Sequence, residues 1–173
     1  SNVTTQITGS VRELCEAAMR AAETFGYEPV LLTDELGCEA REAGSMMASI
    51  VRTHAKDGRK LCYVAGGETV VHLIGQGKGG RNQELALAAA PGISGIKNAC
   101  VFSVGSDGTD GPTDAAGGYV DGDTMDTLRD QGLDVFTVLQ ENDAYTALKA
   151  AEGLVMTGPT GTNVNDVAMA LLD

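Results

Sequence analysis

The sequence predicts an α/β fold: a layered, Rossmann-like sandwich in which a largely parallel or mixed sheet is flanked by helices. Apolar residues with a helical period alternate along the chain with short apolar runs that are typical of strands. Several of these runs end in polar, Gly-rich loops, as strands do when they lead into helices. With 173 residues, 43% of them hydrophobic, the chain is long enough for one domain with a sizeable core.

The predicted elements of the first half begin with a helix. Ser10 to Glu13 reads S-x-x-E, which is a capping box, and Gly26 ends the apolar helical face that follows it. The other elements expected here are a short buried strand at 30–32, a helix at 39–56 with Met46 facing inward, strands at 61–65 and 69–74, and a helix from Asn82 or Gln83 to Ala89.

The second half continues the alternation. Its expected elements are a strand at 99–104, a helix near 123–131, a strand at 135–139, a helix at 143–150 capped by Asn142, a strand near 154–156 and a terminal helix. No internal repeat or low-complexity segment interrupts them. If the sheet is mainly parallel, the loops that follow its strands gather at one edge, where ligands of such sheets bind.

Composition excludes several classes of partner. The formal net charge of −12 argues against binding to nucleic acid or to an anionic membrane, because both would repel the chain. No apolar run approaches the length of a transmembrane helix and no signal peptide opens the chain, so we expect a cytoplasmic protein. The four cysteines stand singly and lack zinc-site spacing, which predicts buried, reduced thiols.

The stretch GQGKGGRNQE is the first candidate site. Gly75, Gly77 and Gly80 have the spacing G-x-G-x-x-G, and Lys78 and Arg81 lie within the same loop. The spacing fits a dinucleotide loop, although a Gly-rich turn with solvated cations is an open alternative. A Walker A loop is excluded because no Ser or Thr follows Lys78. Two cations beside a helix N-terminus favour a bound anion.

The loop GSDGTDGPTD carries three aspartates. Carboxylate oxygens suit Mg²⁺ beside a polyphosphate, so we predict that Asp107 and Asp110 are functional and that Asp114 is structural. The spacing is not that of an EF-hand. Asp side chains that cap N–H groups of their own loop are the alternative.

Two further loops supply polar groups. TGPTGTNVND offers short donors and acceptors at Thr160, Thr162 and Asn163, while capping of the expected last helix by Asn163 or Asn165 is the competing interpretation. Glu68 follows Gly66 and Gly67, and it either approaches a ligand or lies in a turn.

Long ordered motifs in these loops resemble a known family. GGETVVHLIGQGKGGRNQELAL, VFSVGSDGTDGPTDAAGGYVDGDT, ENDAY and VMTGPTGTNVNDVAMAL are similar to the C-terminal, MOFRL-type domain of class II glycerate kinases, some of which have been labelled hydroxypyruvate reductases. The resemblance covers nearly the whole chain from Gly9 onward. It implies an ATP- and Mg²⁺-dependent kinase that phosphorylates D-glycerate, usually at the 2-hydroxyl, in a cleft between two α/β domains.

The resemblance also implies roles for individual residues. Lys78 and Arg81 would face phosphate or the glycerate carboxylate, and Asp107 and Asp110 would hold Mg²⁺ or accept the proton of the attacking hydroxyl. The expected substrate- and nucleotide-binding residues are Gly66, Gly67, Glu68, Gly79, Gly80, Asn82, Gln83, Thr160, Gly161, Thr162 and Asn163.

The same resemblance suggests a domain organisation. Residues 1–8 are expected to be a linker that begins with a cloning remnant, Ser1-Asn2, and residues 9–173 to be the C-terminal domain of a two-domain kinase. An N-terminal domain would complete the site, so the isolated domain is expected to be inactive. The alternatives are an NAD(P)-dependent hydroxypyruvate reductase and a non-catalytic module that binds a nucleotide or a sugar acid. No well-placed catalytic His supports the reductase. The hydroxyl that is phosphorylated and the oligomeric state stay open.

Overall fold

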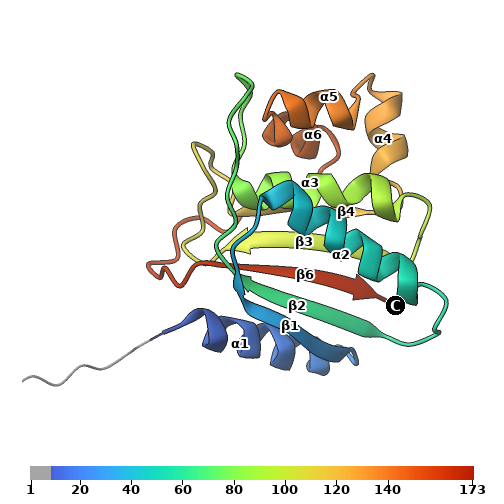
Figure 1. Cartoon of the computed structure of the whole chain (residues 1–173), viewed down its shortest axis with the longest axis vertical. Coiled ribbons are helices and arrows are strands. Elements are labelled where there is room, and N and C mark those ends of the chain that lie inside the picture. The colour runs from blue at the N-terminus through green and yellow to red at the C-terminus, as the bar shows by residue number, and fades with distance from the viewer. Residues whose placement is uncertain (1–8) are drawn as a thin grey trace, which may run out of the picture.

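The computed structural model describes residues 9–173, so the linker predicted at 1–8 lies outside the described residues. Its strands are β1 (Glu28–Leu36), β2 (Leu61–Gly67), β3 (Ala99–Gly105), β4 (Gly117–Asp121), β5 (Leu154–Val155) and β6 (Asp166–Leu172). They form one six-stranded sheet in the order β1-β2-β6-β3-β4-β5 (Figure 1). Only β1 and β2 pair in parallel, and the other four pairs are antiparallel. The α/β sandwich is therefore confirmed, with a mixed sheet.

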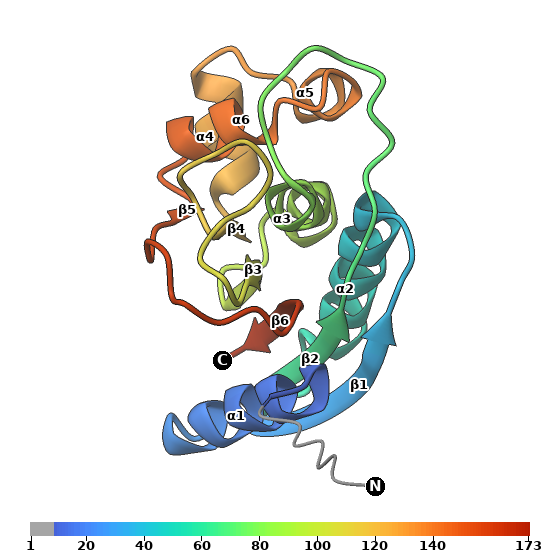
Figure 2. The same cartoon turned by 90° about the vertical axis from the view of Figure 1, so that its left-hand side faces the viewer.

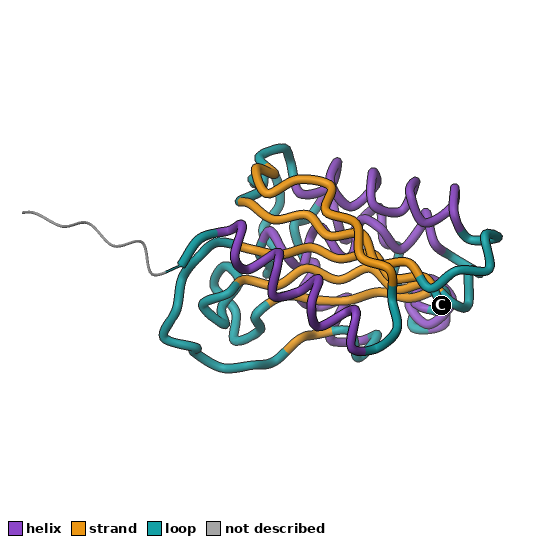
Figure 3. Tube along the Cα trace, turned by 90° about the horizontal axis from the view of Figure 1, so that it is seen from below, coloured by secondary structure: helices purple, strands orange, loops and turns teal. Residues whose placement is uncertain are grey.

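Helices cover both faces of this sheet. They are α1 (Val11–Thr24), α2 (Ala40–His54), α3 (Arg81–Ile93), α4 (Thr124–Asp130), α5 (Val135–Gln140) and α6 (Ala144–Ala150). Helix α1 crosses the strands on one face, as the view from below shows (Figure 3). Helices α2 and α3 pack side by side on the other face, and α4, α5 and α6 lie against the outer side of α3 (Figure 2).

Two hydrophobic clusters hold these layers together. The larger lies between the sheet and α2 and α3, and includes Met47, Leu85 and Val101. The smaller lies beneath α1, where Cys15 and Cys62 are fully buried. Burial raises the pKa of the Cys62 thiol to about 11. All four thiols are free, but Cys38 is exposed, so the prediction that every cysteine is buried was wrong.

Strand β6 corrects the prediction of a terminal helix. It lies in the middle of the sheet, antiparallel to both β2 and β3, and six of its seven residues are buried. A continuous apolar run that is buried on both faces has no alternation, so periodicity cannot distinguish it from a buried helix. With no helix here, Asn163 and Asn165 have none to cap.

The segment 69–74 is not the predicted strand. Its one bridge joins Val70 to Glu39, and the side chains of Leu73 and Ile74 are 80% and 69% exposed. The apolar pattern was misleading because these side chains stand on a connection between β2 and α3 rather than in the sheet.

Residues 135–139 also form a helix, α5, rather than a strand. Asp134 caps it by accepting a hydrogen bond from the Thr137 amide at 2.9 Å. Strand β4 was not predicted because Gly117 and Gly118 look like loop residues. A Cβ on Gly117 would overlap the Ser103 carbonyl of β3, so this strand requires glycine.

The remaining elements occur close to where they were expected. The Ser10 hydroxyl accepts from the Glu13 amide at 3.2 Å and starts α1. Strand β1 is longer than predicted and lies at the sheet edge, where Val30 is 42% exposed. Met46 of α2 is likewise exposed rather than inward. Asp143, not Asn142, occupies the N-cap position of α6. Within residues 9–173, no helix combines the length and apolar character needed to cross a membrane.

Candidate functional site

Three strands meet at one edge of the sheet and bring the polar loops together. Because β6 is antiparallel to its neighbours, it begins where β2 and β3 end. Asp166, its first residue, lies opposite Gly67 on one side and Gly105 on the other. The loops thus gather at one edge as expected, although an antiparallel central strand rather than a parallel sheet brings them there.

A cleft of about 660 Å³ opens at this edge. Its walls come from the connection after β2, the first turn of α3 and the loop after β3, together with Asn142 between α5 and α6. The lining residues are Glu68, Thr69, Val70, Val71, Leu73, Gly79, Gly80, Arg81, Glu84, Asp107, Thr109, Asp110, Gly111, Pro112 and Asn142.

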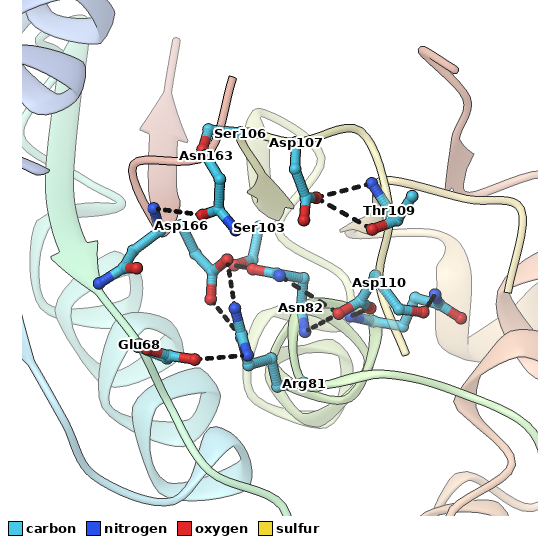
Figure 4. A network of polar contacts seen from close by, with 12 residues as sticks. Glu68, Arg81, Asn82, Ser103, Ser106, Asp107, Thr109, Asp110, Asn163 and Asp166 are labelled. Atoms are coloured by element: carbon cyan, nitrogen blue, oxygen red, sulfur yellow. Dashed lines mark hydrogen bonds and ion pairs between the residues drawn. The ribbon is translucent and has the colours of Figure 1, made fainter. Parts of the chain in front are cut away.

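Arg81, the first residue of α3, is held at the cleft by two carboxylates (Figure 4). Its Nε and one terminal nitrogen donate to the two oxygens of Asp166 at 2.6 and 3.0 Å, and the other nitrogen donates to Glu68 at 2.9 Å. The hydrogen bond to Asp166 is the largest cause that raises the pKa of Arg81. Sequence reasoning missed Asp166. Its signal was an acidic residue that opens a fully apolar run.

Asp110 occupies the N-terminus of α3. Its carboxylate accepts from the amides of Asn82 and Gln83 at 3.1 and 2.8 Å and from the Asn82 side chain at 3.2 Å. A Cβ on Gly80 would overlap this carboxylate, which explains the glycine. Burial is the main cause that raises the pKa of Asp110, and these hydrogen bonds oppose it. The anion expected at this helix end is therefore the protein's own, and the geometry favours a structural role over the predicted metal-binding one.

Asn82 and Gln83 are buried beneath the cleft rather than exposed in it. The Asn82 side chain accepts from the Ser103 hydroxyl at 2.6 Å. The Gln83 side chain donates to the Asp110 carbonyl at 3.3 Å and to the Thr113 hydroxyl at 2.8 Å. The side chains of Asn82 and Gln83, which were predicted to bind a ligand, thus fix the start of α3 against β3 and the Asp110 loop.

Asp107 leaves one carboxylate oxygen available. Its Oδ1 accepts from the amide and the hydroxyl of Thr109 at 2.9 and 3.1 Å, which is a local Asx turn. Its Oδ2 accepts no hydrogen bond from any residue in 9–173, and the residue lines the cleft. An oxygen of this kind suits Mg²⁺, which needs only one or two carboxylates when phosphate and water supply the other ligands.

Lys78 makes none of the contacts that hold Arg81. Its amide donates to Asp143 at 2.9 Å, and its ammonium stands 4.1 Å from the centre of the Tyr145 ring. The Tyr145 hydroxyl donates to Asp114 at 2.7 Å, and this bond is the main cause that lowers the pKa of Asp114. Lys78 is not among the residues that line the cleft.

The glycines of G-x-G-x-x-G are explained by packing. A Cβ on Gly75 would overlap the backbone of Glu141, and one on Gly77 would overlap Asp143. The spacing therefore reflects close contact with residues 141–143, and nothing in it requires a dinucleotide. Gly79, in contrast, lines the cleft as predicted.

Gly66 and Gly67 also serve packing. A Cβ on Gly66 would overlap Cys15 of α1, and one on Gly67 would overlap the backbone of Leu36 in β1. Neither lines the cleft, whereas Glu68 directly after them does.

The segment 157–165 supports the aspartate loop from outside the cleft. The Thr160 amide donates to the Asp107 carbonyl at 3.0 Å and its hydroxyl donates to the Ser106 carbonyl. Asn163 accepts from the Asn165 amide at 3.2 Å. The predicted binding residues Thr160, Gly161, Thr162 and Asn163 do not line the cleft, so their contacts here are with the protein itself.

One family of known proteins matches the part of the chain that contains the cleft. The family is described as the MOFRL family, and it matches residues 61–166, a span that contains the whole cleft. The chain belongs to the MOFRL family. The matched span includes the cleft arginine and both of its carboxylate partners.

Two similar proteins are named as kinases of glycerate. D-glycerate 2-kinase from Thermotoga maritima is 49% identical over 99% of this MOFRL chain, and glycerate 2-kinase from Pyrococcus horikoshii is 48% identical over 91% of it. A relative from Agrobacterium vitis, 38% identical over 99% of the chain, carries a provisional hydroxypyruvate reductase name.

Solved structures give the same result. The crystal structure of the glycerate kinase from Thermotoga maritima superimposes on the whole chain with a TM-score of 0.95 at 48% identity. The chain spans 42% and 37% of the two kinases' sequences and 43% of the solved chain. It thus spans about two fifths of the length of each of these relatives.

Proposed function

We propose that residues 9–173 form the C-terminal domain of a glycerate 2-kinase, which transfers the γ-phosphoryl group of ATP to D-glycerate. One observation carries the proposal: Arg81 is fixed by two carboxylates in a cleft that Asp107 also lines, and the second carboxylate oxygen of Asp107 accepts no hydrogen bond from residues 9–173. Phosphoryl transfer depends on positioning and on charge neutralisation, and this pair supplies groups of both signs. The names and the fold of the relatives support it.

Arg81 would position the transferred group. A guanidinium has five N–H donors, and three of them are engaged with Asp166 and Glu68, which leaves two for a phosphate or carboxylate oxygen. The carboxylates restrict the guanidinium to one orientation, so little side-chain freedom remains to be lost when substrate binds.

Asp107 would contribute its free Oδ2 in one of two ways. It would hold Mg²⁺, or it would accept the proton of the attacking 2-hydroxyl. When bound, Mg²⁺ supplies charge neutralisation on the phosphates of ATP. No group of three or more His, Cys, Asp or Glu side chains in residues 9–173 is arranged as a metal site, so Asp107 would share the ion with phosphate oxygens and water.

The remaining wall of the site would come from an N-terminal domain. The cleft has Glu68, Glu84, Asp107 and Asp110 beside Arg81, so its own charge is unfavourable for two anionic substrates. Further cations would have to come from Mg²⁺ and from residues outside 9–173. The enzyme would act where ATP is available, as it is in the cytoplasm.

The test measures both reactions in the full-length protein. With D-glycerate and Mg·ATP, we expect ADP and phosphoglycerate to form in equal amounts. With D-glycerate and NAD⁺ or NADP⁺, we expect no increase in absorbance at the NADH band. If NADH or NADPH formed and ADP did not, the proposed kinase function would be wrong and a hydroxypyruvate reductase would take its place. Absence of both reactions, together with binding of Mg·ATP or glycerate, would favour a non-catalytic binding module.

A further inference from the structure

The connection between β2 and α3, residues 68–80, forms a whole wall of the cleft, and we call it the arm (Figure 1). Seven of the cleft-lining residues belong to it. The arm nevertheless has no helix and no strand ladder of its own, and Leu73 and Ile74 near its tip are largely exposed. Something outside the arm must fix its position.

Asn142 makes the main contact with the tip of the arm. Its side-chain oxygen accepts from the amides of Ile74 and Gly75 at 2.8 and 2.9 Å, and its nitrogen donates to the His72 carbonyl at 3.1 Å. A second donation from this nitrogen reaches Glu84 at 3.1 Å. One amide thus uses its whole hydrogen-bonding capacity, and three of the four bonds go to the backbone of the arm.

The amide is anchored in the core at its other end. Asn142 is only 4% exposed, and Glu84, its partner on α3, is 2% exposed. Glu84 also accepts from Arg41 of α2 at 2.6 Å. A chain of polar contacts, buried at Glu84 and Asn142 and half-buried at Arg41, therefore runs from α2 through α3 to the arm. Hydrogen bonds of buried and charged groups are costly to leave unmade, so this chain holds its members in place.

The backbone at Asn142 explains the residue type. Its φ is +53°, in the left-handed region that Asn tolerates better than most residues. The neighbouring residues hold the returning part of the arm, because Gly77 donates to the Glu141 carbonyl at 2.7 Å and Lys78 donates to Asp143 at 2.9 Å. Gly75 and Gly77 have no room for a Cβ because they contact residues 141–143.

We propose that Asn142 is a positioning residue that fixes the arm as the wall of the cleft and so sets how tightly substrate is bound. It acts through the backbone of the arm and through Glu84. Its effect on kinetics rests on the proposed kinase function, but its effect on the arm does not.

The test uses Asn142→Gly in the full-length protein, because glycine keeps the left-handed backbone and removes only the amide. Hydrogen exchange at the amides of Ile74 and Gly75 should accelerate by at least about tenfold, since each loses its acceptor. The KM for glycerate or for ATP should rise by about tenfold while kcat changes by less than about threefold, the pattern for loss of binding common to ground state and transition state. Glu152→Gly is the matched control, since Glu152 has a φ of +56° on an exposed turn.

A second variant, Gly75→Ala, keeps Asn142 but pushes the arm away from Glu141, and it should give the same acceleration and the same rise in KM. Unchanged exchange at Ile74 and Gly75 in Asn142→Gly would overturn the proposal, as would a loss of kcat with constant KM in both variants. Exchange requires no turnover. The role in fixing the arm is therefore decided even if the full-length protein fails to phosphorylate glycerate.

Discussion

Lys78 and Arg81 stand three residues apart in one Gly-rich loop, yet the structure gives them different surroundings. Arg81 is bound by Asp166 and Glu68 at the cleft, whereas Lys78 lies over the Tyr145 ring outside the residues that line it. The difference follows from the backbone. Arg81 begins helix α3, whose N-terminus Asp110 caps. Lys78 still belongs to the arm, and its backbone amide donates to Asp143. Sequence proximity of two cations is thus poor evidence that they share a ligand.

The largest expected effect is at the cleft arginine. Arg81→Ala in the full-length protein should lower kcat by about 10³-fold or more, as loss of a phosphate-directed arginine does in other phosphoryl-transfer enzymes. Arg81→Lys should recover little, because an ammonium cannot bridge Asp166 and a phosphate with fixed geometry. Steady-state ADP release and thermal unfolding should be measured together. Near-normal turnover in a folded Arg81→Ala protein would remove this residue from the mechanism.

The partner of the arginine should give the next largest effect. Asp166→Asn keeps the volume but replaces one acceptor oxygen by an N–H donor, so one of the two bonds to the guanidinium is lost and the other loses its charge. We expect kcat to fall by about 10²-fold through misplacement of Arg81. We also expect a loss of about 1–3 kcal/mol in the free energy of unfolding, since the Asp166 side chain is 9% exposed and Arg81 is 35% exposed. Denaturant unfolding measures the second quantity. A stability loss with constant kcat would make the pair purely structural.

Lys78→Ala should have a much smaller effect and so sharpens the contrast. Removing an ammonium from an aromatic ring lowers stability by about 0.5–1 kcal/mol at an exposed site. We expect kcat to change by less than about threefold, because Lys78 does not line the cleft. Glycerate phosphorylation by the full-length variant checks this. A fall comparable to that of Arg81→Ala would mean that Lys78 turns toward the substrate when the two domains close.

The smallest expected effect concerns the cap that fixes Arg81. Burial raises the pKa of Asp110 above its value of about 3.9 in an unfolded chain, so the folded protein binds more protons in the interval above that value. Stability contributed by Asp110 should therefore decrease as pH rises through this interval. The difference in unfolding free energy between wild type and Asp110→Asn should shrink from pH 4 to pH 6. Urea titrations at each pH measure it, and a difference that grows would mean that the hydrogen bonds outweigh burial.

Elements with a complete local signal could be predicted from the sequence. The helix that starts at Ser10 has its cap, its apolar face and its terminal glycine within one stretch of chain. The strand at 166–172 could not be recognised in this way, because its identity depends on burial between β2 and β3. The segment 135–139 had its capping signal at Asp134, which the prediction overlooked.

For the candidate site too, residues with a local sequence signal were predicted and residues that depend on distant contacts were not. Arg81 and Asp107 were singled out by residue type and loop composition, and both line the cleft. Asp166 was missed because its pairing with Arg81 can be recognised only when β6 is known to be an inner strand of the sheet. The packing role of Gly75 and Gly77 could not be predicted because the backbone of residues 141–143, which they contact, is more than sixty residues away in the sequence.

The position of β6 has a consequence for how the protein folds. It is the last strand of residues 9–173, and within the sheet they form it joins β1 and β2 on one side to β3, β4 and β5 on the other. Without β6, strands β2 and β3 would each be an exposed edge, and unpaired edges of this kind are prone to association. Asp166 arrives with this strand, so the cleft arginine acquires its partner only in the step that closes the sheet. Completion of the sheet and of the pair between Arg81 and Asp166 would then be one event.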